Sequence, residues 1–288
     1  MSTTEYKQGM LYLCATPIGN LGDITVRVLD TLRKVDLIAA EDTRNSIKLL
    51  NHFEIGVPLT SYHEYNKYDK AQELIEKMQK GMNVALITDA GTPAISDPGE
   101  VLVRMCMEAG ITVTSLPGAC AAITALTVSG LPTARFCFEG FLPPDKKERA
   151  QRLQEIAAET RTIILYEAPH HLCSTLKELR DTLSERKISI IRELTKKYEE
   201  VVSMKLSETE AYYDGREPKG EYVLVLEGRN VEEDIAAQQD NWKKLPLDEH
   251  MAIYEEQGLD RKECMKRVAA DRGVSKRDIY AQLIKEDQ

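Results

Sequence analysis

Short apolar runs alternate with segments of helical periodicity from residue 10 to about residue 228, and this alternation restricts the chain to α/β architectures. Between the early runs, apolar residues recur at helical spacing, as Val28, Leu32 and Val35 do. The runs predict strands over residues 10–15, 37–40, 84–88, 112–116, 136–141, 162–167, 188–192 and 222–226. We therefore expect an α/β fold whose sheet is at least partly parallel.

The pair Pro143 and Pro144 interrupts this pattern and predicts a boundary between two α/β lobes. The stretch after the last predicted strand is acidic and rich in glutamine, and we interpret it as a linker. The remaining residues predict three short helices. The expected parts are a first lobe, a second lobe, a linker and a small helical domain, at residues 1–142, 143–230, 231–245 and 246–288.

The last predicted helices have the rhythm of a helix-turn-helix unit. The segment RKECMKRVAADRGVSKRDIYAQLIK contains an alanine pair and the turn residue Gly273, and Ser275 then caps a helix that places Ile279 and Leu283 inside. A small helical cap without any ligand explains the same pattern equally well. Both interpretations stay open on the sequence alone.

The charge of the chain is unevenly distributed. A net charge of -9 argues against a protein that coats nucleic acid indiscriminately. Residues 231–260, however, carry nine acids and two bases, whereas residues 261–285 carry eight bases and three acids. A basic tail on an acidic protein provides a local footprint for phosphates.

Several familiar sites and segments are missing from the sequence. No GxGxxG follows the first strand, and there is no P-loop, GxSxG or HExxH motif, so we expect neither a dinucleotide fold nor a metal site. No apolar run approaches the ~18 residues of a membrane helix, and the N-terminus lacks the pattern of a signal peptide. The six cysteines form no CxxC pair, which is typical of reduced thiols in the cytoplasm.

Loops rich in small residues follow four of the predicted strands, at residues 15–23, 89–99, 116–122 and 166–171. Small residues allow backbone N–H and C=O groups to approach a ligand directly. Ligands of open α/β sheets bind where such loops converge, at the carboxyl ends of the strands. Four such loops in one chain therefore predict a ligand site.

Six motifs that follow one another along the chain indicate the chemistry of this site: TPIGNLGDIT, AEDTR, DAGTPAISDPG, PGACAAITAL, EAPHHL and RELTKKYEE. The chain that carries them resembles the tetrapyrrole methylase superfamily of S-adenosylmethionine (SAM) enzymes, a class III methyltransferase fold. Within it, the motifs are similar to the branch that methylates the ribose 2′-oxygen of a cytidine in the decoding centre of 16S rRNA. The resemblance implies SAM in a cleft between two lobes, a homodimer, and 16S rRNA within the 30S subunit as partner, without DNA.

The resemblance also assigns cofactor contacts to the small-residue loops. Thr92 stands where precorrin-type relatives have aspartate, so a carboxylate contact to the cofactor is not carried over to that position. The residues implied in cofactor binding are Thr16, Pro17, Ile18, Gly19, Asp89, Gly91, Thr92, Ile95, Cys120, Ala121, Tyr166 and Glu167.

A ribose hydroxyl is a weak nucleophile, so a general base or an oriented hydrogen bond should assist the transfer. The polar residues on the expected cleft-facing motifs are Asp42, Arg44, Glu64, Glu167 and Arg192, and none is assigned as the base. Each has a structural alternative, such as a capping pair of Asp42 with Arg44. RNA phosphates are expected to contact Lys146, Lys147, Arg149, Arg152, Lys196, Lys197, Lys276 and Arg277.

Two other functions remain as alternatives. The first is C-methylation of a precorrin or uroporphyrinogen within the same fold. This function would not explain the basic tail. The second is a helix-turn-helix regulator with a ligand-sensing α/β module, which would bind SAM without turning it over. The RNA-methylating interpretation accounts for the motifs and for the basic tail together.

Overall fold

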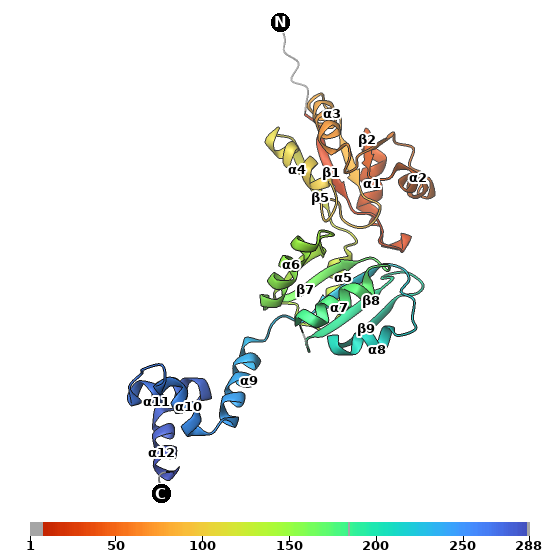
Figure 1. Ribbon diagram of the computed structural model, residues 1–288. Coiled ribbons are helices and arrows are strands. Elements are labelled where there is room, and N and C mark those ends of the chain that lie inside the picture. Colours follow the sequence, from red (N-terminus) through yellow and green to blue (C-terminus); the bar gives the residue numbers. More distant parts are fainter. Residues whose placement is uncertain (1–7, 184, 287–288) are drawn as a thin grey trace. The chain divides into compact units, whose positions relative to one another are not determined.

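The computed structural model describes residues 8–183 and 185–286, and the chain divides into two compact units, Met1–Gly228 and Arg229–Gln288. Figure 1 labels most of the helices and strands. The strands are β1 (Met10–Cys14), β2 (Leu37–Ala40), β3 (Leu59–Ser61), β4 (Val84–Ile87), β5 (Thr112–Leu116), β6 (Phe136–Phe141), β7 (Thr162–Glu167), β8 (Lys187–Arg192), β9 (Glu200–Lys205) and β10 (Tyr222–Leu226). The helices of the first unit are α1 (Val26–Lys34), α2 (Thr43–His52), α3 (Lys67–Gln79), α4 (Gly99–Glu108), α5 (Ala121–Val128), α6 (Lys146–Ala158), α7 (Leu172–Leu183) and α8 (Thr209–Tyr213), with 3-10 turns η1 (Leu21–Asp23) and η2 (Leu206–Glu208).

The first lobe is a parallel sheet in the order β3-β2-β4-β1-β5. Its central strands are buried on both faces, which is why they read as uninterrupted apolar runs in the sequence. One face packs on α1 and α2 through a cluster around Leu32 and Leu50, and the other packs on α3 and α4 through Leu74 and Leu102. The lobe therefore has the predicted α/β construction.

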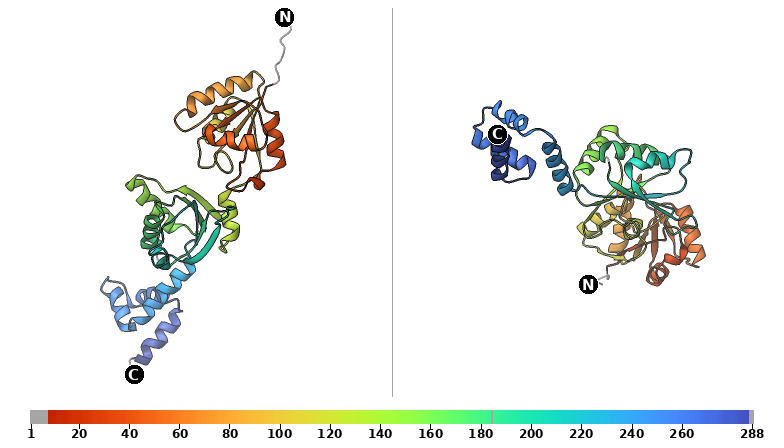
Figure 2. Two further views of the ribbon diagram at one scale, coloured as in Figure 1. Left: turned by 90° about the vertical axis from the view of Figure 1, so that its right-hand side faces the viewer. Right: turned by 90° about the horizontal axis from the view of Figure 1, so that it is seen from below.

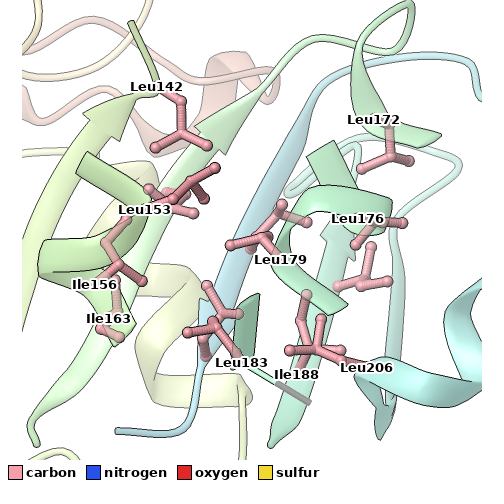
Figure 3. Packing of buried hydrophobic residues seen from close by; sticks show 14 of the residues in the cluster. Leu142, Leu153, Ile156, Ile163, Leu172, Leu176, Leu179, Leu183, Ile188 and Leu206 are labelled. Atoms are coloured by element: carbon pink, nitrogen blue, oxygen red, sulfur yellow. The ribbon is translucent and has the colours of Figure 1, made fainter. Parts of the chain in front are cut away.

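The second lobe is a mixed sheet in the order β6-β7-β10-β8-β9, in which only the β6–β7 pair is parallel. In Figure 2 the strands of this sheet run from green to cyan and those of the first lobe from red to yellow. Figure 3 shows the cluster that covers one face of this sheet, where Leu176 and Leu179 of α7 pack toward Ile163 and Ile188 of the strands. The other face packs on α5.

Two strands and one helix differ from the expectations. β3 has only three residues, and β9 is a half-exposed edge strand, so neither carries an apolar run. The segment 231–245, expected as a linker, is helical: residues Val231–Lys244 form helix α9, capped by the Asn230 side chain. An N-cap side chain and an acidic first turn both favour this helix. The sequence analysis did not use these two features, because it interpreted the Gln-rich composition as that of a linker.

The second unit consists of α9 (Val231–Lys244), α10 (Leu247–Glu255), α11 (Arg261–Arg272) and α12 (Lys276–Glu286). Gly273 ends α11 in the left-handed conformation, and the Ser275 hydroxyl accepts a hydrogen bond from the Asp278 N–H, as the sequence predicts. Trp242 of α9 stacks on the buried His250 ring at 4.2 Å. This contact makes α9 part of the helical unit. Within the described residues, no helix is long and apolar enough to cross a bilayer.

Candidate functional site

A cavity of about 530 Å³ lies within the first unit, where loops at the ends of both sheets meet. Its size is typical of a site for a small organic ligand. The first lobe contributes residues after β1, β2, β4 and β5, and the second contributes residues at the ends of β6, β7 and β8 and at the start of β10. The lining consists of Ile18, Glu41, Thr88–Thr92, Ile95–Asp97, Cys120, Ala121, Phe141, Tyr166–Pro169, Ile191, Leu194 and Glu221–Val223.

The loop between β4 and α4 is fixed in an unusual conformation. Ala94 and Ser96 have positive φ angles of 69° and 61°, a region that side chains other than glycine rarely adopt. The Asp97 carboxylate accepts hydrogen bonds from three backbone N–H groups, those of Ala94 (3.0 Å), Ile95 (3.1 Å) and Gly99 (2.7 Å). Strained backbone persists only where surrounding contacts enforce it, and it concentrates at ligand sites.

The same loop is tied to the first strand-end loop. Thr16 and Gly91 exchange two backbone hydrogen bonds, at 2.9 and 3.1 Å, and the Thr16 hydroxyl donates to the carbonyl of Thr88. The Thr92 hydroxyl donates to the Ala119 carbonyl at 2.9 Å, which joins the loop to the one after β5. Three loops therefore form one connected wall of the cavity.

The lining contains five carboxylates, those of Glu41, Asp89, Asp97, Glu167 and Glu221. Among its described residues there is no lysine or arginine. Burial, together with the nearby Asp89 and Asp97, raises the pKa of Glu41. The described residues include no group of three or more His, Cys, Asp or Glu placed to hold a metal ion. Carboxylates in a partly desolvated cavity favour a cationic organic ligand and repel phosphates.

SAM fits this lining. Its sulfonium and amino groups exceed its single carboxylate in charge, so it is a net cation. The apolar residues Ile18, Ile95, Leu194 and Val223 offer surface to its uncharged parts. Gly91, with a φ of 83°, brings backbone to the cavity wall without a side chain.

Nine of the twelve residues implied in cofactor binding line the cavity: Ile18, Asp89, Gly91, Thr92, Ile95, Cys120, Ala121, Tyr166 and Glu167. The other three do not line it. Thr16 holds the β4 loop, and Pro17 is buried. Gly19 packs against Lys196, whose Cγ would lie 2.4 Å from a Cβ at this position. Thr16 therefore positions the lining without forming it, whereas Pro17 and Gly19 lie outside the lining.

Among the five candidate catalytic residues, Glu167 alone lines the cavity. Its carboxylate accepts hydrogen bonds from the Thr175 hydroxyl and the Ala168 N–H, so both oxygens have partners. Asp42 caps α2 and pairs with Arg44 at 2.8 Å, as the structural alternative predicts, and the Arg44 hydrogen bonds lower the pKa of Asp42 to about 2.

The remaining two candidates are held in local contacts outside the cavity lining. Glu64, in the turn before α3, pairs with Lys67, the first residue of that helix. Arg192 donates from Nε to the Lys219 carbonyl at 2.7 Å. The structure thus brings neither side chain to the cavity.

The cavity residues that the sequence analysis did not assign as contacts include Glu41, Phe141 and Glu221. Glu41 precedes Asp42 in the motif AEDTR, and it is the first residue after β2, at the edge where the ligand loops converge. Its position at the strand end was a usable signal. The sequence contains no such signal for Phe141 or Glu221, because their placement depends on the strand pairing of the second sheet.

The predicted RNA-contacting residues divide into free and paired groups. Lys146 and Lys147 are exposed on the first turn of α6, and within the described residues no carboxylate pairs with them. Lys197 lies 5.6 Å from the ring centroid of the exposed Tyr198. Lys276 and Arg277 are on the first turn of α12.

The other three are occupied by internal partners. Arg149 donates to Glu178 and Thr175, both at 2.7 Å, and Arg152 pairs with Glu139 at 2.6 Å. Lys196 pairs with Glu193 and Glu221. These ion pairs compete with phosphate for the same side chains.

The fold and the site together define the class to which this chain belongs. Its two-lobed α/β unit is similar to a solved uroporphyrin-III C-methyltransferase from Thermus thermophilus, complexed with S-adenosyl homocysteine, with a TM-score of 0.53 and 18% identity over 76% of this chain and 97% of that one. The family model of the tetrapyrrole (corrin/porphyrin) methylases matches residues 10–210. The architecture is therefore that of this methylase fold.

Sequence comparison identifies the group of methylases within this class that the chain resembles. The chain is 48% identical over 273 residues to ribosomal RNA small subunit methyltransferase I of Synechocystis sp., covering 94% of this chain and 96% of the relative. It is 46% identical over 272 residues to the protein of that name from Bacillus subtilis, covering 94% and 93%. The chain belongs to the tetrapyrrole methylase family and, within it, to the group of the ribosomal RNA small subunit methyltransferases I.

The raised pKa of Glu41 gives a prediction for Glu41→Gln. The folded pKa lies above the unfolded value, so the group's stabilising contribution is complete below about pH 4.5 and is lost as pH rises through the folded pKa. Glutamine does not ionise, so the variant does not lose stability in this way as the pH rises. We expect the variant to gain melting temperature at pH 8, with the gain shrinking toward pH 4.5, measured by thermal unfolding without ligand.

The same substitution should weaken SAM binding several-fold in calorimetry, because it removes a carboxylate that faces a cation. Glu64→Gln is the matched control, since Glu64 is outside the cavity lining, and it should leave SAM affinity unchanged. An equal stability gain at pH 4.5 and pH 8 would show that the effect does not come from ionisation of Glu41.

Proposed function

We propose that this protein transfers the methyl group of SAM to the ribose 2′-oxygen of a cytidine in the decoding centre of 16S rRNA within the 30S subunit. The observation that carries the proposal is the acid-lined cavity, without lysine or arginine among its described residues, in a chain 48% identical to a ribosomal RNA small subunit methyltransferase I. A ribosomal substrate would place the reaction in the cytoplasm. The tetrapyrrole alternative rests on the shared fold alone, because three solved structures of tetrapyrrole methyltransferases with this fold are between 16% and 20% identical to this chain.

SAM supplies an activated methyl group, so the chain needs to position the reactants more than to form a covalent bond with them. Holding two reactants in line contributes up to ~7–11 kcal/mol in favourable cases. The wall of loops around Thr92 and Gly91 would hold the cofactor, and the apolar residues Ile18, Leu194 and Val223 would exclude water from it.

Among the cavity carboxylates, we propose Glu41 as the acceptor of the ribose hydroxyl proton. Its pKa is raised by burial and by Asp89 and Asp97, which makes it a stronger base than an ordinary carboxylate. Glu167 is less available, because the Thr175 hydroxyl and the Ala168 N–H already donate to its two oxygens. A positioned base contributes about 10²–10⁴-fold in rate.

We also propose a homodimer. β5 and β6 each form one edge of their sheet, and α5, a helix without a charged residue, connects them. Ile123 and Val128 of α5 are 46% and 44% exposed, and Phe136 of β6 is 38% exposed. An exposed apolar helix surface and two unpaired strand edges favour coverage by a second copy. A monomer mass at every micromolar concentration in sedimentation would contradict this.

The experiment that tests the function is methyl transfer from labelled SAM to 30S subunits isolated from cells that lack the protein. We expect label in one decoding-centre cytidine, with resistance to alkaline cleavage on its 3′ side. Subunits from cells that contain the protein serve as the control, because an already methylated site accepts no label. Absence of label in 30S subunits and in free 16S rRNA, despite measured SAM binding, would overturn the proposal.

A further inference from the structure

Strand β6 carries a β-bulge immediately before it reaches the cavity. Its parallel register with β7 runs from Phe136 to Phe138 and resumes at Gly140, which leaves Glu139 as an extra residue. Gly140 has a φ of 64°, and a Cβ there would lie 3.2 Å from the Ser96 hydroxyl of the strained loop. Bulges bend a strand and re-aim its side chains, often beside active sites.

The bulge changes the face on which Phe141 emerges. Side chains alternate along a strand, so an unbulged β6 would place residue 141 on the same face as residues 137 and 139. That face packs on α6: Cys137 joins the outer core cluster, and Glu139 pairs with Arg152. Instead, the Phe141 ring packs edge-on against Tyr166 at 5.6 Å, as Phe138 does at 5.0 Å.

Phe141 is thereby brought to the rim of the cavity as an exposed aromatic ring. It lines the cavity and is 57% exposed, whereas Ile18 and Leu194 in the same lining are each 8% exposed. The ring is not loosely held, because its support, Tyr166, is fixed by a hydrogen bond from the Ala122 N–H to its hydroxyl, at 3.2 Å. A rigid, exposed aromatic side chain at the rim offers a flat face to an incoming ligand.

The charge of the cavity lining determines which part of a nucleotide can enter the cavity. Glu221 is paired with Lys196, but the other four cavity carboxylates form no ion pair among the described residues and repel phosphate, whereas a nucleobase is neutral. The unpaired Lys146 and Lys147 of α6 follow Phe141 by five and six residues, at an exposed helix start outside the cavity lining. Phosphates are therefore favoured at α6 and the base at the ring.

We propose that Phe141 is the stacking surface for the displaced nucleobase of the target nucleotide. This inference rests on the proposed RNA function and adds the subsite that holds the base. Stacking on an aromatic side chain contributes about 1–3 kcal/mol per base, which is close to the cost of removing a base from its helix. The bulge is the structural device that makes this surface available.

The test compares Phe141→Leu with Phe141→Tyr, because leucine keeps an apolar side chain and tyrosine keeps the aromatic ring. We expect Phe141→Leu to lower kcat/KM on 30S subunits by about 5- to 150-fold and Phe141→Tyr to stay within threefold of wild type. SAM affinity, measured by calorimetry, should be unchanged in both. Thermal unfolding of both variants is the control for general damage to β6.

Two results would overturn the inference. A kcat/KM of Phe141→Leu within threefold of wild type would show that the ring does not hold the base. A weakened SAM affinity in Phe141→Leu would assign the ring to the adenine of the cofactor instead. Saturation-transfer NMR with cytidine monophosphate and S-adenosylhomocysteine separates this inference from the proposed function, because Phe141-dependent binding of the nucleotide would persist even if 30S subunits accepted no methyl group.

Discussion

Asp97→Ala should reduce SAM affinity at least 100-fold and lower the free energy of unfolding by about 2–4 kcal/mol. The carboxylate accepts three backbone hydrogen bonds, and bonds to a charged acceptor contribute about 1.5–3 kcal/mol each. It also holds Ala94 and Ser96 at positive φ, a conformation that costs about 1–3 kcal/mol per residue. Without Asp97, the loop should relax away from the cavity. Calorimetry with SAM and denaturant unfolding measure the two effects.

Asp97→Asn separates the hydrogen bonds from the charge. Oδ1 of Asp97 accepts from Ala94 and Gly99, and Oδ2 accepts from Ile95. Asparagine keeps one acceptor oxygen and can retain the first two bonds, so its loss of stability should be less than half that of alanine. If both variants lose SAM affinity equally while only alanine loses stability, the charge of Asp97, and not the loop conformation, governs cofactor binding.

The sequence was sufficient to predict the parallel lobe and most of the cavity wall. Strands such as β2 and β4 are covered by helices on both faces, and burial on both faces requires an uninterrupted apolar run. The wall followed from small residues such as Gly91 at the ends of these runs, because backbone that approaches a ligand excludes large side chains.

What could not be predicted depends on contacts between segments distant in sequence. β9 is an edge strand with one solvent-facing side, so its composition resembles a loop. The position of Phe141 depends on a bulge that is defined only by the pairing of β6 with β7. The choice between Glu41 and Asp42 depends on which of two adjacent carboxylates turns back to cap α2. Local periodicity carries none of this information.

Gly91→Val should abolish detectable SAM binding and lower the free energy of unfolding by about 2–4 kcal/mol. Gly91 has a φ of 83°, where a β-branched residue is strongly disfavoured. Its N–H and C=O are both bonded to Thr16, so the peptide cannot rotate to relieve the strain. A Cβ would lie 3.3 Å from Cγ2 of Ile18, and the remaining valine atoms would crowd the cavity wall. SAM calorimetry and denaturant unfolding test both parts.

Gly110→Val is the matched control for backbone strain. Gly110 has a φ of 72°, and a Cβ there would meet nothing within 4 Å, so the substitution adds the same kind of strain without crowding. We expect it to lower stability by about 1–2 kcal/mol and to leave SAM affinity unchanged. The difference between the two variants then measures the space that the cofactor needs beside Ile18. If Gly91→Val bound SAM as tightly as Gly110→Val, the cofactor would not contact this wall, and the assignment of the cavity to SAM would be wrong.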